Sequence, residues 1–278
     1  MFKKISTIIM LSLFFIGLSV LLYPAISSYW NSKTQSQVVQ SYENMIEKMS
    51  REDSDAIFEA AEAYNEALLG LEHPLRQYNQ VEGYYKTLNL NDMGMMGYIT
   101  IDRIGVELPI YHSVSESVLS FAAGHMEGSS LPVGGESVHT VLSAHRGLPN
   151  AKLFTDLDRV QEGDIFSIKI LDRTFLYQVD QVLTVWPENT ADIQIVEGKD
   201  YCTLVTCTPY GINTHRLLVR GVRIDTVTER QVYVGDEAYR IDTLIVTPIV
   251  ALPILFVLIM IVMFQPVKQE HVIEGDDV

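Results

Sequence analysis

Two uncharged apolar segments stand near the ends of this 278-residue chain, at residues 5–22 and 244–264. A helix needs about 20 such residues to span the hydrocarbon core of a bilayer. The first segment follows Lys3 and Lys4, a pattern that membrane anchors and secretory signals share, and its length favours an anchor. Small residues at Ala25-Ile-Ser27 leave cleavage of a signal as the alternative.

The two segments predict how the chain is divided. Positively charged residues flanking a span stay in the cytoplasm, which places Lys3, Lys4 and the later Lys268 on the same side of the membrane. The residues between the two spans then lie outside the cell. The expected parts are an N-terminal anchor or signal at 1–30, a helical region and connector at 31–96, a β domain at 97–236, a C-terminal transmembrane helix at 243–265 and a cytoplasmic tail at 266–278.

The formal net charge of −15 restricts the partners of the chain. Nucleic acid and anionic lipid both repel such a protein. We therefore expect no nucleic-acid partner, and we interpret the acidity mainly as an aid to solubility outside the membrane.

Residues 32–71 are rich in helix formers. Ser50 with Asp53 three positions later is a capping signal. Glu72-His-Pro-Leu75 ends the helical pattern, because proline disfavours helical geometry before it. One apolar stripe with helical spacing predicts a helix that packs on its own domain: Ile57, Ala61, Tyr64 and Leu68.

From Gly97 the apolar residues alternate with polar ones, as in strands. Short turns separate these segments, so the sequence predicts an all-β-dominated, closed or nearly closed barrel. A short helix is expected at 150–157. The predicted strands are Tyr98–Ile101, Val106–Ile110, Val138–Leu142, Ile165–Leu171, Thr174–Trp186, Tyr201–Cys207 and Arg216–Ile224, with Val232–Val234 as a further candidate.

The chain has two cysteines, Cys202 and Cys207. A spacing of five on a strand directs them to opposite faces, which argues against a disulfide between them. Cys202 fits a small buried hydrophobe. Cys207 ends a β-branched segment between Thr206 and Thr208, a position with the partial exposure that a reactive thiol needs. A buried structural thiol is the alternative for Cys207.

Several residues compete for the partner roles of a reactive thiol. Among the seven histidines, His145 combines the end of a β-branched segment with a following Arg-Gly turn. Arg216 follows Cys207 by nine residues, and spacing alone does not separate it from Arg220. A thiol, an imidazole and a guanidinium are the groups of a cysteine acyl-transferase. No zinc, phosphate-loop or dinucleotide motif occurs, so no metal and no cofactor are expected.

These segments resemble the sortase family, and specifically class C, the pilin-polymerising sortases. The resemblance covers nearly the whole chain. Thr203-Leu-Val-Thr-Cys207 matches the family's Thr-Leu-x-Thr-Cys signature, and the similarity continues through Arg216. Ser143-Ala-His145-Arg-Gly147-Leu-Pro149 is similar to the family's histidine segment. Leu153-Phe-Thr-Asp-Leu157 and the stretch from Gly124-His125 to Gly134 also resemble class C sequences.

The resemblance implies an eight-stranded sortase barrel and a role for each matching residue. Cys207 would be the nucleophile, His145 the general acid and base, and Arg216 the group that orients the substrate or stabilises the oxyanion. Thr206 and Thr208 would contact the substrate. The implied reaction cleaves a Leu-Pro-x-Thr-Gly-like sorting signal between Thr and Gly through a thioester, and then joins the acyl group to a lysine amine of a pilin.

One segment departs from the class C pattern. Many class C sortases carry a lid with the sequence Asp-Pro-aromatic over the nucleophile. The corresponding residues here are His73, Pro74 and Leu75. The autoinhibitory role of this segment is therefore an open prediction.

Two alternative functions follow from the same residues. A housekeeping-type sortase would attach proteins to a peptidoglycan amine instead of a pilin lysine. A non-catalytic, membrane-tethered barrel would bind exported proteins and would not need Cys207 as a nucleophile.

Overall fold

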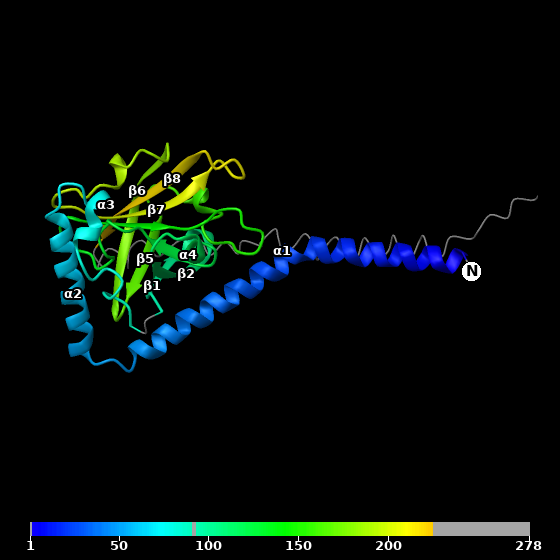
Figure 1. Cartoon of the computed structure of the whole chain (residues 1–278), viewed down its shortest axis with the longest axis horizontal. Helices are drawn as coiled ribbons and strands as arrows, with labels where there is room; N and C mark the ends of the chain where they lie inside the picture. Colours follow the sequence, from blue (N-terminus) through cyan, green and yellow to red (C-terminus); the bar gives the residue numbers. More distant parts are fainter. Residues whose placement is uncertain (1, 91–92, 225–278) are drawn as a thin grey trace, which may run out of the picture. The chain divides into compact units, whose positions relative to one another are not determined.

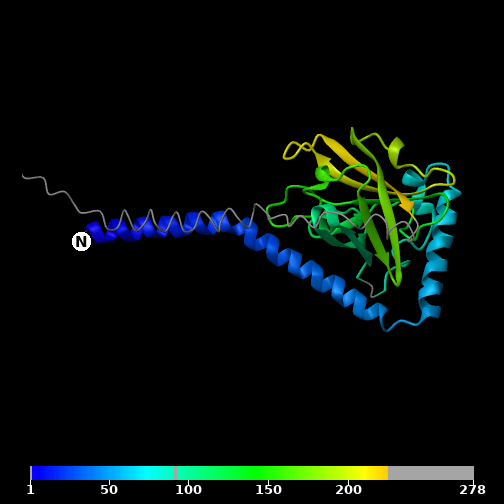
Figure 2. The same cartoon turned by 180° about the vertical axis from the view of Figure 1, so that it is seen from behind.

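The computed structural model describes residues 2–90 and 93–224, and the described residues from Ile26 onward contain a closed β-barrel (Figure 1). Around the barrel the strands follow the order β1-β2-β3-β4-β7-β8-β6-β5. The view from behind shows the long strands β6 and β8 crossing the barrel (Figure 2). The strands are β1 (Met95–Ile101), β2 (Val106–His112), β3 (Ala123–His125), β4 (Val138–Ser143), β5 (Ile165–Ile170), β6 (Arg173–Val185), β7 (Asp200–Thr208) and β8 (His215–Ile224).

The closed barrel confirms the predicted fold class. Two neighbouring pairs, β2 with β3 and β4 with β7, are parallel, and the other neighbours are antiparallel. All seven strands predicted between Tyr98 and Ile224 are present, with ends shifted by a few residues. The candidate strand Val232–Val234 lies outside the described residues.

The sequence missed β3, which completes the barrel. Its three residues, Ala123–His125, have neither the length nor the β-branched side chains of an independent strand. It is a strand because β2 and β4 pair with it on its two sides.

The short helix predicted at 150–157 is wrong. These residues form turns that lead to the 3-10 helix η3 (Leu157–Arg159). Leu153 has a φ of 41°, in the left-handed region, which a right-handed helix excludes. Leu153 and Phe154 are both buried, so packing of these side chains takes the place of helical hydrogen bonds.

Helices precede the barrel and connect its strands. Ser50 caps α2 by accepting a hydrogen bond from the backbone N–H of Asp53, as predicted. Tyr64 and Leu68 of the predicted stripe are buried against the barrel core, whereas Phe58 is buried in place of the half-buried Ile57. The helices are α1 (Phe2–Ile46), α2 (Arg51–Leu69), α3 (Pro74–Gln77), η1 (Tyr78–Gln80), η2 (Asp102–Ile104), α4 (Glu116–Leu119), η3 and η4 (Ala191–Ile193).

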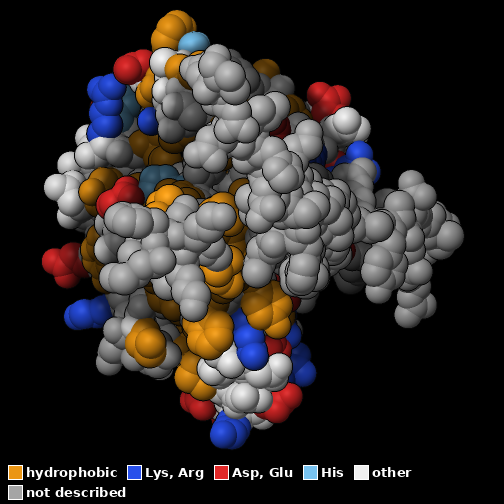
Figure 3. Space-filling view, turned by 90° about the vertical axis from the view of Figure 1, so that its right-hand side faces the viewer, with side chains coloured by type: hydrophobic (Ala, Val, Ile, Leu, Met, Phe, Trp, Pro, Cys, Tyr) orange, Lys and Arg blue, Asp and Glu red, His pale blue; other side chains and the backbone are white. Residues whose placement is uncertain are grey.

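Helix α1 contains the N-terminal apolar segment. Among residues 2–90 and 93–224 it is the one helix long and apolar enough to cross a membrane, a property that signal sequences share. Large hydrophobic side chains such as Leu13, Phe15 and Val20 are exposed on it. Hydrophobic side chains gather on the face drawn in Figure 3, with charged side chains of both signs toward its edge. The predicted span at 243–265 and the tail at 266–278 lie outside the described residues.

The described chain divides into two compact units within α1. Residues 2–25 belong to one unit, and the described residues from Ile26 onward belong to the other. In the second unit, the buried Tyr42 hydroxyl donates to the carbonyl of Met96 and accepts from the N–H of Leu171. These two bonds fasten the end of α1 to β1 and to the turn after β5.

Candidate active site

Strand β7 separates two packed regions. Cys202 and Leu204 are fully buried in the main core of the barrel. Val205 points to the other face, where it belongs to a smaller hydrophobic group that we call the outer cluster. Its buried members are Val141, Ile193, Val205 and Leu218, and the half-buried Leu75, Met126, Leu183 and Val185 pack against them.

Cys207 lies on the outer-cluster face of β7, two residues beyond Val205. Its side chain is half-buried and its thiol is free. Cys202 is also free, but it is completely buried, and burial raises the pKa of its thiol well above the usual value. The predicted absence of a disulfide and the buried position of Cys202 are confirmed, which leaves Cys207 as the accessible thiol of the described chain.

Strand register places Arg216 beside Cys207. The two residues are directly paired across the antiparallel strands β7 and β8. Residues opposite each other in such a pair project from the same face of the sheet. Arg220 pairs with Thr203, four residues before Cys207, and its guanidinium is bound by both carboxylate oxygens of Asp180. The structure thus distinguishes Arg216 from Arg220 as the neighbour of Cys207, which sequence spacing could not do.

His145 lies just after β4, which neighbours β7 on the side opposite β8. In the parallel β4–β7 pair, Ser143 is aligned with Val205. The alignment continues past the strand, because the Ala144 N–H donates to the Val205 carbonyl and the Thr206 hydroxyl donates to the Ala144 carbonyl over 2.8 Å. One further step of the same register would place His145 level with Cys207.

The imidazole of His145 has a partner that the sequence did not reveal. Its Nε2 lies 3.0 Å from both carboxylate oxygens of Glu116 on α4. The His145 side chain is 26% exposed and that of Glu116 is 81% exposed. No spacing rule connects residues 29 positions apart, so no signal in the sequence pointed to this pair.

Two loops pack against each other beside these residues. Arg146 forms an ion pair with Asp158, and its guanidinium lies 5.7 Å from the ring centre of Tyr210. A Cβ on Gly147 would come within 3.0 Å of the same ring, and Gly147 has a φ of 78°. The loop after β4, which carries His145, therefore needs glycine at position 147. Tyr210 of the β7–β8 loop packs against this loop.

The two predicted substrate-contacting threonines lie in different environments. Thr206 is 1% exposed, and its hydroxyl is used in the bond to Ala144. Thr208 is half-buried on β7 next to Cys207. Their contact with a substrate stays a prediction, and the structure gives Thr206 a role in holding the His145 segment.

The predicted lid residues lie in α3 and at the position just before it. Leu75, in α3, packs against the outer cluster. Gly128 (φ 86°) allows this approach, because a Cβ there would come within 2.7 Å of the Leu75 Cα and 2.8 Å of the Pro74 carbonyl oxygen. His73 is exposed and precedes the α3 turn.

Four other described histidines have surroundings that differ from those of His145. His112, His125 and His139 are buried, and His215 is half-buried with its ring 4.1 Å from that of Trp186. His271 lies outside the described residues. The Nε2 of His125 lies 2.9 Å from the Ser130 carbonyl and its Nδ1 lies 2.9 Å from the Tyr84 hydroxyl, as fits a neutral ring.

Burial of His125 predicts a loss of stability in acid. Desolvation lowers its pKa to about 4, below the value of about 6.5 in an unfolded chain. The unfolded state then binds a proton that the folded state does not, so stability falls as the pH drops from about 6.5 toward 4. For this residue the expected loss of unfolding free energy between pH 7 and pH 5 is about 2 kcal/mol. Denaturant unfolding of the protein in detergent at the two pH values measures it, and a His125→Gln variant with the same pH dependence as the parent would contradict the assignment.

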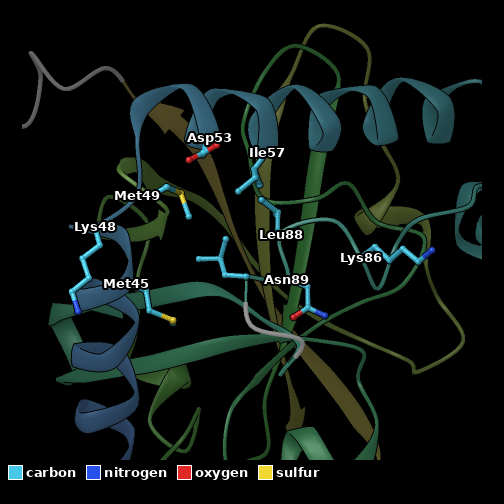
Figure 4. Close-up of a pocket in the computed structure, with 9 residues that line it drawn as sticks. Met45, Lys48, Met49, Asp53, Ile57, Lys86, Leu88 and Asn89 are labelled. Atoms are coloured by element: carbon cyan, nitrogen blue, oxygen red, sulfur yellow. The ribbon is translucent and has the colours of Figure 1, made fainter.

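Among residues 2–90 and 93–224, no three His, Cys, Asp or Glu side chains come together as metal ligands would. A cavity of about 410 Å³ lies where α1 ends and α2 begins (Figure 4), and Cys207 does not line it. Its lining mixes apolar and charged side chains: Met45, Lys48, Met49, Asp53, Ile57, Lys86, Leu88, Asn89 and Leu90.

Comparisons of the sequence and of the fold with known proteins point to one family. The family model for the sortase domain matches residues 99–224, which contain all eight strands except the beginning of β1. The crystal structure of sortase C1 from Streptococcus agalactiae is similar, with a TM-score of 0.62 and 45% identity over 68% of this chain and 98% of that chain.

Two further proteins are similar. Sortase C from Streptococcus pneumoniae, whose structure is described in connection with catalysis and pilin substrate specificity, has a TM-score of 0.62 and 42% identity, covering 68% of this chain and 97% of that chain. Sortase A from Streptococcus agalactiae is 28% identical over 121 residues, which are 42% of this chain and 49% of that protein. This chain thus spans about half of that sortase A.

Proposed function

This chain belongs to the sortase family of transpeptidases and resembles class C sortases in structure, and on that basis we propose that it joins pilin subunits through a Cys207 thioester. The observation that carries the proposal is the strand register. Cys207 is paired with Arg216 on β8, and His145 lies two residues after Ser143, whose partner on β7 is Val205. This register supports the assignment of nucleophile, cation and acid–base group to Cys207, Arg216 and His145, which lie at or just beyond the ends of three neighbouring strands.

In the first step the Cys207 thiolate attacks the carbonyl carbon between Thr and Gly of a Leu-Pro-x-Thr-Gly-like signal. Arg216 stabilises the negative charge that develops on the carbonyl oxygen. The C–N bond then breaks, and protonated His145 gives its proton to the departing amine. The products are a thioester on Cys207 and a free peptide that begins with Gly.

In the second step a lysine amine of a pilin attacks the thioester. His145 takes a proton from this amine, the C–S bond breaks, and Cys207 leaves as the thiolate. The covalent intermediate divides one difficult amide exchange into two easier acyl transfers. No metal or redox group takes part in this scheme.

The surroundings of the site support a peptide substrate. The outer cluster offers apolar side chains next to Cys207, and Thr208 is half-buried beside it. We propose that the cluster receives the apolar part of the sorting signal and that Leu75, with His73 and Pro74, covers it in the absence of substrate. The apolar N-terminal part of α1 supports attachment to the cell membrane. In the proposed arrangement the barrel lies outside the cell and residues 243–265, which lie outside the described residues, form a second span.

Trapping the intermediate tests the proposed function. The full-length protein in detergent is mixed with a Leu-Pro-x-Thr-Gly peptide, and intact-protein mass spectrometry follows the acyl group. The expected adduct has the mass of the peptide up to Thr and maps to the fragment that contains Cys207. Adding a pilin lysine peptide should release the adduct as a ligated product. Release by a peptidoglycan amine and not by the pilin lysine would instead identify a housekeeping-type sortase, and the absence of any adduct would contradict the proposal.

The lid role predicts how fast Cys207 reacts with thiol reagents. A Leu75→Asp substitution places a charge against the outer cluster and is expected to displace the lid, since burying an unpaired charge is costly. Labelling of Cys207 in intact cells by a membrane-impermeant thiol reagent should then become about tenfold faster, which corresponds to a change of about 1.4 kcal/mol in the lid equilibrium.

A matched variant controls for the added charge. Leu69→Asp makes the same change at an exposed position at the end of α2. It should leave the labelling rate unchanged. Equal rates for Leu75→Asp and the parent protein would refute the lid, and the absence of labelling in cells would refute the extracellular position of the barrel.

A further inference from the structure

A carboxylate that no motif identified is fixed against the candidate acid–base histidine. Both oxygens of Glu116 lie 3.0 Å from Nε2 of His145, within hydrogen-bond distance of one N–H. Glu116 is 81% exposed, so the pair is not one that burial requires for the stability of the fold.

The local fold explains why the carboxylate sits there. Helix α4 begins at Glu116, and the N–H groups of Val118 and Leu119 bond to the carbonyl of Ser115. The segment lies directly on β3, because a Cβ on Gly124 would meet the Ser113 carbonyl oxygen at 2.3 Å and the Leu119 side chain at 3.0 Å.

Strand β3 in turn brings this segment to the end of β4. Gly124 is paired with Ser143, and His145 follows Ser143 by two residues. The glycine at position 124 therefore lets α4 approach the strand end from which His145 emerges. The β3 strand that the sequence missed is the element that connects the two.

Hydrogen-bond chemistry then determines the form of the imidazole. A carboxylate only accepts hydrogen bonds, so Nε2 of His145 must carry the proton in this contact. Nδ1 is left as the nitrogen that exchanges a proton with the reacting groups. An acid–base histidine whose ring is oriented by a third group is a recurring feature of nucleophilic catalysis.

We propose that Glu116 is a positioning residue for the transpeptidation reaction. It holds His145 in the Nε2–H tautomer, aims Nδ1 at the proton-transfer position, and offsets the positive charge of the ring when His145 is protonated. The inference rests on the proposed function, because it assigns Glu116 to the acid–base step of that reaction. Glu116 does not contact the substrate in this scheme and acts through His145.

Single-turnover kinetics test the proposal on the full-length protein in detergent. Glu116→Ala should slow acylation of Cys207 by a sorting-signal peptide about 10- to 30-fold, while the peptide concentration for half-maximal rate changes less than about threefold. Glu116→Asp should recover most of the rate, because it restores a carboxylate on the same helix. Glu136→Gln, which alters an exposed carboxylate before the opposite end of β4, should behave as the parent protein.

The outcomes separate the possible explanations. A parental acylation rate in Glu116→Ala would overturn the proposal, as would a variant in which only the aminolysis step is slowed, since that result would place Glu116 at the acceptor amine. Failure of the parent protein to acylate would count against the proposed function instead.

A measurement without substrate tests the same inference independently. The ¹⁵N chemical shifts of the His145 ring, assigned with a His145→Gln variant, should indicate the Nε2–H tautomer in the parent and a mixture of tautomers in Glu116→Ala. Identical ring shifts in the two proteins would overturn the proposal whether or not the enzyme acylates.

Discussion

Replacement of Cys207 by alanine is expected to abolish both the thioester and the ligated product. Cys207 is the one half-buried thiol of the described chain, and Cys202 is fully buried on the other face of β7 and cannot substitute for it. Removing the nucleophile of a covalent mechanism lowers the rate by at least about 10,000-fold. Intact-protein mass spectrometry with a sorting-signal peptide, followed by addition of the acceptor amine, measures both steps.

Two controls make this expectation specific. Cys202→Ala removes a thiol of the same strand and should retain acylation, although the small cavity it leaves in the core lowers stability. Cys207→Ala should unfold at the same denaturant concentration as the parent, because the side chain is only half-buried. Ligated product from Cys207→Ala at a parental rate would remove the cysteine mechanism and would favour another nucleophile.

Replacement of Gly97 by alanine is expected to have the largest effect on stability. A Cβ at this position of β1 would lie 2.1 Å from the Lys169 carbonyl oxygen and 2.6 Å from the Ile170 side chain. The first contact is with backbone of the neighbouring strand β5, so no rotation of a side chain can relieve it. The strands must separate, and we expect the free energy of unfolding to fall by about 3 kcal/mol or more.

A second glycine provides the matched control. Gly70 ends α2 with a φ of −69°, and an added Cβ would meet its nearest atom at 3.4 Å. Gly70→Ala should therefore be neutral or stabilise the protein by up to about 1 kcal/mol, because alanine restricts the unfolded chain. Denaturant unfolding followed by tyrosine and tryptophan fluorescence compares the two variants. A Gly97→Ala protein as stable as the parent would show that β1 and β5 do not approach as closely as described.

Local sequence patterns were sufficient for most of the fold. Strands with alternating or β-branched residues, such as those ending at Cys207 and Ile224, were predicted because each carries its own periodicity. The cap at Ser50 and the break at Pro74 were also local, since a hydroxyl and a pyrrolidine ring act on the backbone next to them. β3 and the turns at 150–157 escaped prediction because β3 depends on strand pairing and the turns on burial of Leu153 and Phe154.

The candidate site likewise combines features that the sequence predicted with features that only the structure revealed. The identities of Cys207, His145 and Arg216 followed from their motifs and from the family resemblance, because their side chains have chemistry that few other residues supply. The choice of Arg216 over Arg220 by geometry required the β7–β8 register. Two contacts join segments that are distant in sequence: Glu116 with His145, and Leu75 with the outer cluster. No local sequence pattern encodes such contacts.

By itself the sequence predicted a β domain with one candidate reactive thiol, preceded by a helical region and an apolar N-terminal segment. It did so through periodicity and residue chemistry, which act over a few neighbouring positions. The tertiary structure decided which groups meet around that thiol. Closure of the barrel brings β4 and β8 to the two sides of β7, and the short strand β3, enabled by Gly124, carries Glu116 to His145.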